Sequence, residues 1–117
     1  MRHHNSVRKL SRPRNQRSAL LKSLALSLIK SGKIKTTEAK AKELRPFAEK
    51  LVTKAKKGDL ASRRLVVARL MNREPEVKKL FDVIAPKYKD QKGGYIRIIK
   101  VQRRLGDGSK MAYIEFV

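Results

Sequence analysis

Apolar residues recur at helical spacing through the first two thirds of the chain. The first stripe predicts a helix that is capped at Asn15 or Ser18 and runs to about Ser31. Gly32 follows as the residue that ends it. A core-facing helix explains this spacing better than a membrane-lying helix, which usually keeps Trp or Phe at the edges of its apolar face. The members of the stripe are Leu20, Leu21, Leu24, Leu28 and Ile29.

A second stripe predicts a longer helix from Glu38 to Lys57, capped by Thr36 or Thr37. Glu38 lies in its first turn, where the helix dipole favours a negative charge. Pro46 interrupts this helix, but the apolar period continues across it, so we expect a kink and not a break. The members of the stripe are Ala41, Leu44, Ala48, Leu51, Val52 and Ala55.

Two further helices are predicted by their start and stop residues. Gly58 ends the second helix, and Asp59 caps a third that spans Leu60–Met71. Pro75 suits the first position of a fourth helix, and Pro86 is expected beyond the end of that helix. The inward-facing residues of the fourth helix are Val77, Leu80, Phe81 and Ile84.

The pattern then changes to the alternation and the β-branched residues that are typical of strands. Tyr95–Arg104 and Met111–Val117 are predicted to form a hairpin around the turn Leu105–Lys110. The alternation slips between Ile98 and Ile99, which predicts a bulge at that point. Because an isolated hairpin is only marginally stable, we expect it to pack on the helices and to pair with a third strand.

These elements define an α+β fold of two layers. About four helices pack on one face of a small three-stranded mixed sheet, which is made of Lys33–Thr37 and the C-terminal hairpin. Residues 1–16 offer little for a core to bury, so they are predicted to form an extended basic N-terminal arm, and residues 17–117 the globular body. The length predicts that residues 1–117 form a single domain.

The charge of the chain points to its partner. There are 31 Lys and Arg residues against 10 Asp and Glu, a formal net charge of +21. Self-repulsion of this size is tolerated where the surroundings supply negative charge. Nucleic acid is the first candidate, because neutralising phosphates releases counterions. Met1–Thr37 holds no acidic residue, and its basic residues are Arg2, Arg8, Lys9, Arg12, Arg14, Arg17, Lys22, Lys30, Lys33 and Lys35.

Three alternatives stay open at this stage. DNA or an anionic membrane surface would also attract so basic a chain. The acid-free, Arg-rich and Ser-rich start also resembles a mitochondrial presequence, although the basicity continues to the C-terminus and the helix within this start has proper ends. Ser23–Ile29 is the longest uncharged run in the first forty residues, far short of the roughly 20 residues of a transmembrane span.

The sequence offers little for catalysis or metal binding. Cysteine is absent, which removes disulfides, thiolate catalysis and Cys-type zinc sites. His3 and His4 are adjacent and have no third ligand at a metal-binding spacing. Gly106 and Gly108 belong to a turn and open no helix, so they predict no dinucleotide site. We therefore expect no enzyme activity, no cofactor, no metal and no small-molecule substrate.

The many basic residues favour RNA as the partner, bound through its phosphates and its shape. Only six aromatic residues are present, and the sequence holds no RRM, helix-turn-helix or zinc-finger signature. The planar guanidinium of Arg suits bidentate contacts with phosphate. The predicted RNA-binding residues are Arg2, His3, Arg8, Lys9, Arg12, Arg14, Arg17, Lys35, Lys42, Arg45, Arg63, Arg64, Arg97, Lys100, Arg103 and Arg104.

Several short runs keep a recognisable order from one end of the chain to the other. They are Met1-Arg-His3, Arg8-Lys-Leu10 with Arg12, Ile34-Lys-Thr-Thr37, Lys40-Ala-Lys-Glu-Leu-Arg45, Arg63-Arg64-Leu65, Gly93-Gly-Tyr95, Arg97-Ile98, Gly106-Asp107 and Met111-Ala-Tyr-Ile-Glu115. In these runs the sequence resembles the bacterial L17 family of large-subunit ribosomal proteins. The N-terminal motif and the run that ends at Arg45 are the most specific of them.

This resemblance implies a structural protein of the large (50S) ribosomal subunit. It implies large-subunit ribosomal RNA and neighbouring large-subunit ribosomal proteins as partners, no membrane partner, and a ribosome-bound location in the cytoplasm. The fold that it implies, helices against a three-stranded mixed sheet, agrees with the predicted elements. The family often has Asn where Ser11 stands, and a Ser-rich, His-containing segment where Pro13–Arg17 stands, so the contacts of the arm are expected to differ.

Overall fold

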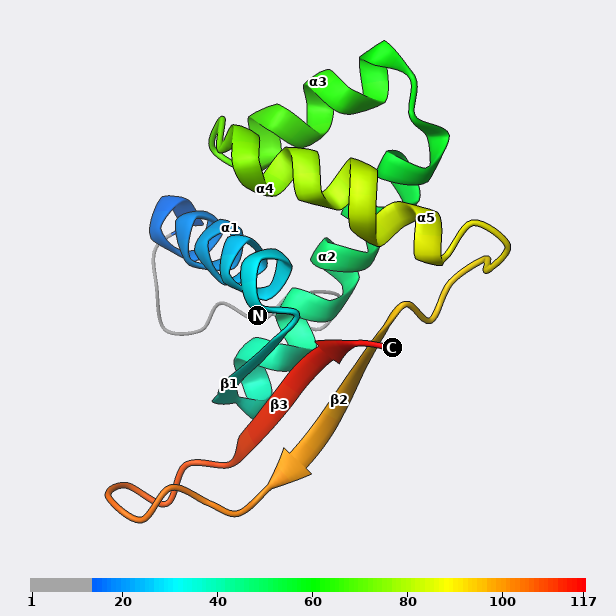
Figure 1. Cartoon of the computed structure of the whole chain (residues 1–117). Coiled ribbons are helices and arrows are strands. Elements are labelled where there is room, and N and C mark those ends of the chain that lie inside the picture. The colour runs from blue at the N-terminus through cyan, green and yellow to red at the C-terminus, as the bar shows by residue number, and fades with distance from the viewer. Residues whose placement is uncertain (1–13) are drawn as a thin grey trace, which may run out of the picture.

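The computed structural model describes residues 14–117 and has the predicted α+β architecture. Its elements are α1 (Arg14–Ser31), β1 (Lys33–Thr37), α2 (Glu38–Lys57), α3 (Leu60–Arg69), α4 (Glu74–Lys79), the π-helical turn η1 (Leu80–Ile84), α5 (Ala85–Lys87), β2 (Ile96–Val101) and β3 (Met111–Phe116). Figure 1 shows α2 between the sheet and the other helices. It contacts all three strands, α1, α3, η1 and α5.

The first helix begins earlier than the sequence predicts. Asn15 and Ser18 lie inside α1, so neither is its cap, and positions 14–16 are helical and not part of an extended arm. The rest of the predicted arm, residues 1–13, lies outside the described residues. Leu28 and Ile29 of the predicted stripe are buried, as is Ala25, one turn before Ile29.

The sheet is entirely antiparallel, so the predicted mixed sheet is wrong. Its strand order is β1-β3-β2, and β3 pairs antiparallel with both neighbours. The predicted bulge is also wrong, because the register runs without interruption from Ile98 opposite Ile114 to Ile99 opposite Tyr113. Ile98 packs against the core, whereas Ile99 lies on the other face and is 40% exposed. The apparent slip in the pattern is therefore an apolar residue on the solvent-facing side of a regular strand.

The junction between α2 and α3 has the predicted chemistry. α2 runs through Pro46 without a break, and its N-cap Thr37 accepts a hydrogen bond from the backbone N–H of Lys40. Gly58 follows it in the left-handed region, with φ of 69°, which suits a residue without a Cβ. Asp59 then caps α3 by accepting a hydrogen bond of 2.7 Å from the backbone N–H of Ser62.

The fourth predicted helix is longer than expected, and Pro86 lies inside it. α4, η1 and α5 follow one another without a gap, and Pro86 is the middle residue of α5. In η1 the N–H of Ala85 donates to the carbonyl of Leu80, five residues back, which is a π-helical step. Pro86 has no N–H to donate, and it follows directly after this π-helical turn. The helix therefore continues past the point where the proline was expected to stop it.

The buried core follows α2 and is closed by two tyrosines. All six residues of the predicted α2 stripe are buried. Tyr88 and Tyr95 are buried as well, with ring centroids 5.3 Å apart, and the hydroxyl of Tyr88 donates to the carbonyl of Val117. The Lys56 ammonium donates to the Tyr95 hydroxyl and to the carbonyl of Gln91, so α2 holds the loop that leads into β2.

We predict that Leu51→Ala in α2 lowers the free energy of unfolding by about 2–5 kcal/mol, because it leaves a cavity at a fully buried position. Urea denaturation at constant ionic strength measures the change. Leu60→Ala is the matched control, since Leu60 is 62% exposed and should change stability by less than about 0.5 kcal/mol. Equal losses in the two variants would contradict the position of α2 at the centre of the core.

Candidate nucleic-acid interface

The face of the sheet opposite α2 carries basic residues from both edge strands. Lys33 of β1, Glu115 of β3 and Arg97 of β2 lie opposite one another in the register and form one row across it. The Arg97 Nε donates to Glu115 Oε1 at 2.8 Å, and the Lys33 Nζ lies 3.9 Å from the other carboxylate oxygen. One carboxylate on the central strand thus links a cation from each edge strand.

The next row on this face holds Lys35, Tyr113 and Ile99. The Lys33 Nζ lies 4.4 Å from the centroid of the Tyr113 ring, and the Lys35 Nζ lies 6.0 Å from it. These are cation–π distances, so the ring helps to hold two ammonium groups on one surface. The Tyr113 side chain is half-buried and lies on this charged face of the sheet.

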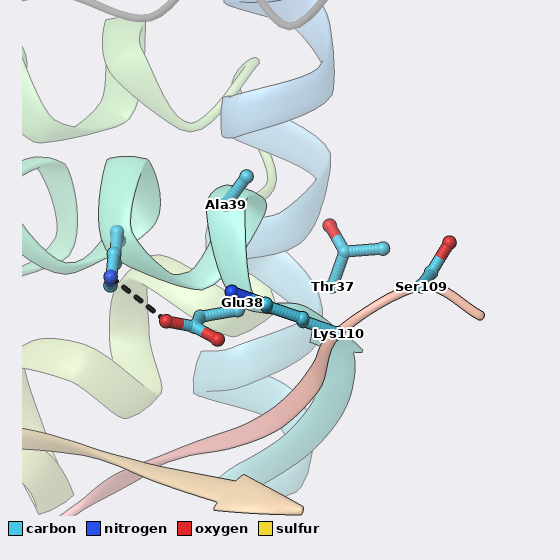
Figure 2. Close-up of a pocket in the computed structure, with 6 residues that line it drawn as sticks. Thr37, Glu38, Ala39, Ser109 and Lys110 are labelled. Carbon is cyan, nitrogen blue, oxygen red and sulfur yellow. Dashed lines mark ion pairs between the residues drawn. The ribbon is translucent and has the colours of Figure 1, made fainter. Parts of the chain in front are cut away.

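Glu38 brings together cations from two elements at the start of α2. Its carboxylate lies 2.9 Å from the Lys42 Nζ and 3.6 Å from the Lys100 Nζ. Figure 2 shows this ion pair between Glu38 and Lys42, with Thr37, Ser109 and Lys110 lining the same pocket. The hydrogen bond from Lys42 holds the pKa of Glu38 below its ordinary value, against the opposing effect of desolvation, and the charges of Lys100, Lys42 and Lys110 lower it further.

The loop between β2 and β3 is ordered by its own polar contacts. The Arg104 guanidinium makes two hydrogen bonds to the Asp107 carboxylate, of 3.0 and 2.6 Å. These bonds keep the pKa of Asp107 well below its usual range. The Arg104 N–H donates to the carbonyl of Ser109, and the Arg103 Nη1 donates to the carbonyl of Gly108 at 3.1 Å. Two of the predicted RNA-binding arginines are therefore fixed relative to the sheet.

Five other predicted residues within the described range lie on the helices and not on the hairpin. On α3, the Arg63 guanidinium lies 5.0 Å from the centroid of the Phe81 ring and is half-buried, whereas Arg64 is exposed. Arg45 is exposed on α2, and on α1 Arg14 is exposed and Arg17 half-buried. Figure 1 shows α3 at the opposite end of the molecule from the β2–β3 loop. The predicted set is thus divided between several surfaces.

The structure gathers one group of the predicted residues, which we call the hairpin-end cluster. Lys42 and Lys100 meet at Glu38, and the other members line a hollow beside the β2–β3 loop. The members of the cluster are Lys35, Lys42, Lys100, Arg103 and Arg104. Five of the predicted residues lie outside the described residues; they are Arg2, His3, Arg8, Lys9 and Arg12.

Sequence reasoning missed two cations of these surfaces, Lys33 and Lys110. Lys33 alternates with Lys35 in the predicted strand, so the two-residue period already placed both on one face. Lys110 lies just before β3, and its carbonyl accepts the N–H of Glu38. No local pattern indicated that this turn residue would lie at the start of α2, because the pairing of β1 with β3 is what brings them together.

Residues 14–117, the described part of the chain, were compared with the side-chain groups that hold metal ions and with helices that cross membranes. Within it, no three His, Cys, Asp or Glu side chains are grouped so as to hold a metal ion. None of the helices in this range combines the length and the apolar character needed to cross a bilayer.

Comparison with known proteins assigns the family. The model of the ribosomal protein L17 family matches residues 20–117. The chain belongs to this family. It is 56% identical to the large ribosomal subunit protein bL17 of Dictyoglomus turgidum over 117 residues, which is the full length of both. The bL17 proteins of Sphingopyxis alaskensis and Campylobacter concisus are 55% and 54% identical, over all of this chain and 84% and 98% of those relatives.

Membership of the L17 family confirms the resemblance that the short runs indicate. The family is one of ribosomal proteins, which are structural components and not enzymes. The match extends over every helix and strand after the first turns of α1, so the whole sheet and its charged face belong to the part that the family model matches.

We predict that Glu38→Gln destabilises the protein near neutral pH and that this difference shrinks in acid. The pKa of Glu38 is lowered in the folded state, so its contribution is fully present above the ordinary value of 4.5 and is lost as the pH falls through the lower folded value. Urea denaturation of both proteins at a series of pH values, at low ionic strength, measures the difference.

A second measurement tests the same ion pairs at neutral pH. About 1 M salt shortens the screening length to roughly 3 Å, so it should also reduce the difference between the wild type and Glu38→Gln. A difference that stays constant from about pH 6 to about pH 3, and in high salt, would mean that Glu38 acts through packing and not through its charge.

Proposed function

We propose that this protein is a structural constituent of the bacterial large ribosomal subunit that binds large-subunit ribosomal RNA through phosphate and shape contacts. The observation that carries the proposal is full-length identity above 50% to proteins named large ribosomal subunit protein bL17. The formal charge of +21 supports it, because a chain this basic needs a polyanion around it.

The arrangement of the cations supports contact with RNA on more than one side. The hairpin-end cluster and the exposed Arg64 lie at opposite ends of a molecule whose longest dimension is 43 Å. A single flat ligand would not reach both, whereas folded RNA presents phosphates along an irregular surface. We assign to this contact the sixteen residues predicted from the sequence, together with Lys33 and Lys110.

The same proposal includes the surroundings of the protein. Ribosomal proteins of the large subunit are the expected protein neighbours, and the protein would work in the cytoplasm, bound to the ribosome.

We predict a steep salt dependence that relies on the basic residues of positions 1–13. If ten cations meet phosphates, the logarithm of the binding constant for a large-subunit rRNA fragment should fall with the logarithm of salt concentration at a slope of about −7 to −9. Deleting residues 1–13 removes Arg2, Arg8, Lys9 and Arg12, so the slope should become less steep by about 3. Filter binding at a series of salt concentrations measures both slopes, and circular dichroism checks that the helices remain.

A variant that loses the same charge elsewhere is the control for this deletion. Lys78, Lys87, Lys89 and Lys92 are exposed and lie outside the proposed contact, so changing all four to Gln should alter the slope by less than about 1. If the control flattens the slope as much as the deletion does, the binding reflects total charge and not a defined surface. Equal affinity for duplex DNA or anionic vesicles would overturn the preference for folded RNA.

A further inference from the structure

The loop between β2 and β3 presents an apolar side chain to solvent on a rigid support. Leu105 is fully exposed at the turn, the most exposed of the large apolar residues among those described. The loop around it is closed by backbone bonds from Arg104 to Ser109 and from Gly108 to Arg104, and by the paired contacts of Arg104 with Asp107. Figure 1 shows this loop extending beyond the helices at the end of the hairpin. The ordered loop therefore holds a fully exposed leucine at a fixed position relative to the sheet.

A hollow of about 550 Å³ lies beside this leucine, within the range of roughly 300–1,000 Å³ that small-molecule pockets span. Its apolar part comes from Leu105, from Val101 at the end of β2 and from Met111 at the start of β3. Val101 and Met111 are paired in the sheet and lie on the same face as Lys35, because Lys35 pairs with Tyr113, two residues after Met111. The open face of the sheet therefore forms one side of the hollow and the loop forms the other.

The polar part of the hollow is cationic. Lys35, Arg103 and Arg104 line it, and none of its lining residues is acidic. Arg104 is paired with Asp107 and acts as a positioning residue for the loop. A guanidinium carries five N–H donors, so Arg103 can bond to the carbonyl of Gly108 and to a phosphate at the same time. An apolar surface bordered by ammonium and guanidinium groups matches a ligand with one flat, weakly polar face and one anionic group.

We propose that this hollow receives one unpaired nucleotide of the RNA, extruded from its helix, with the base against Leu105, Val101 and Met111 and its phosphate toward Lys35 and Arg103. This inference rests on the proposed function and names the element of RNA structure that the hairpin end recognises. Apolar side chains are known to take the place of neighbouring bases in this way. An apolar segment of a neighbouring protein fits less well, since it would bury these cations without neutralising them.

The test compares two RNA stem-loops with equal numbers of phosphates, one fully paired in its stem and one with a single unpaired adenosine in the stem. The full-length wild type should bind the RNA with the unpaired adenosine about fivefold more tightly, which is the lower end of what a base stacked on an aromatic side chain contributes. Leu105→Ser should abolish this preference and leave the affinity for the fully paired stem unchanged. Leu60→Ser is the matched control, because Leu60 is an exposed leucine on α3 and should keep the preference.

A crosslink locates the nucleotide directly. With 4-thiouridine at the unpaired position, irradiation should attach the RNA to the peptide that spans positions 101–111, and Leu105→Ser should reduce the yield several-fold. Attachment elsewhere, or equal binding of both stems by the wild type, would overturn the inference and assign the exposed leucine to a protein contact. If the wild type binds neither RNA in low salt, the proposed function fails with it.

Discussion

The fold depends on the burial of one face of the helix α2. Its apolar stripe is buried against the three strands and against helices that precede and follow it in the chain. Lys56 near its end holds the loop before β2, and Glu49 accepts a hydrogen bond from the N–H of Ile96 at the start of that strand. Since β2 and β3 form no more than a hairpin between themselves, the position of the whole sheet is set by α2.

Carboxylates are scarce in this chain, and the structure places two of them where cations from different elements converge and a third within the hairpin loop. Glu115 joins β1 to β2 through the central strand, and Glu38 joins α2 to β2. Asp107 closes the hairpin loop by pairing with Arg104. Exposed ion pairs contribute little to stability one by one, but in a chain with 31 basic residues they decide which cations can lie close together.

Local sequence patterns were sufficient to predict which segments form helices and which form strands, because caps and apolar periods act within a few residues. They correctly indicated Gly58 and Asp59 at the junction of α2 and α3. Local patterns failed where the structure of a segment depends on a contact with residues far away in the sequence. The direction of β1 in the sheet depends on its pairing with β3, and Pro86 is accommodated by a π-helical step that no local rule predicts. The burial of Tyr88 also depends on a distant contact, because its ring packs beside the C-terminal strand.

Only part of the protein's positive charge is free to bind RNA phosphates. A phosphate that approaches Lys42 or Lys100 must compete with Glu38, and one that approaches Arg97 must compete with Glu115. These cations are therefore better suited to fixing the shape of the surface than to supplying most of its affinity. Lys35, held only near the Tyr113 ring among its described contacts, has no such competitor at short range. The cations that are paired with carboxylates form a rigid frame, and a few cations without a carboxylate partner at short range lie beside it. Because these cations are held at fixed spacings, the surface favours a defined RNA shape over any polyanion of equal charge.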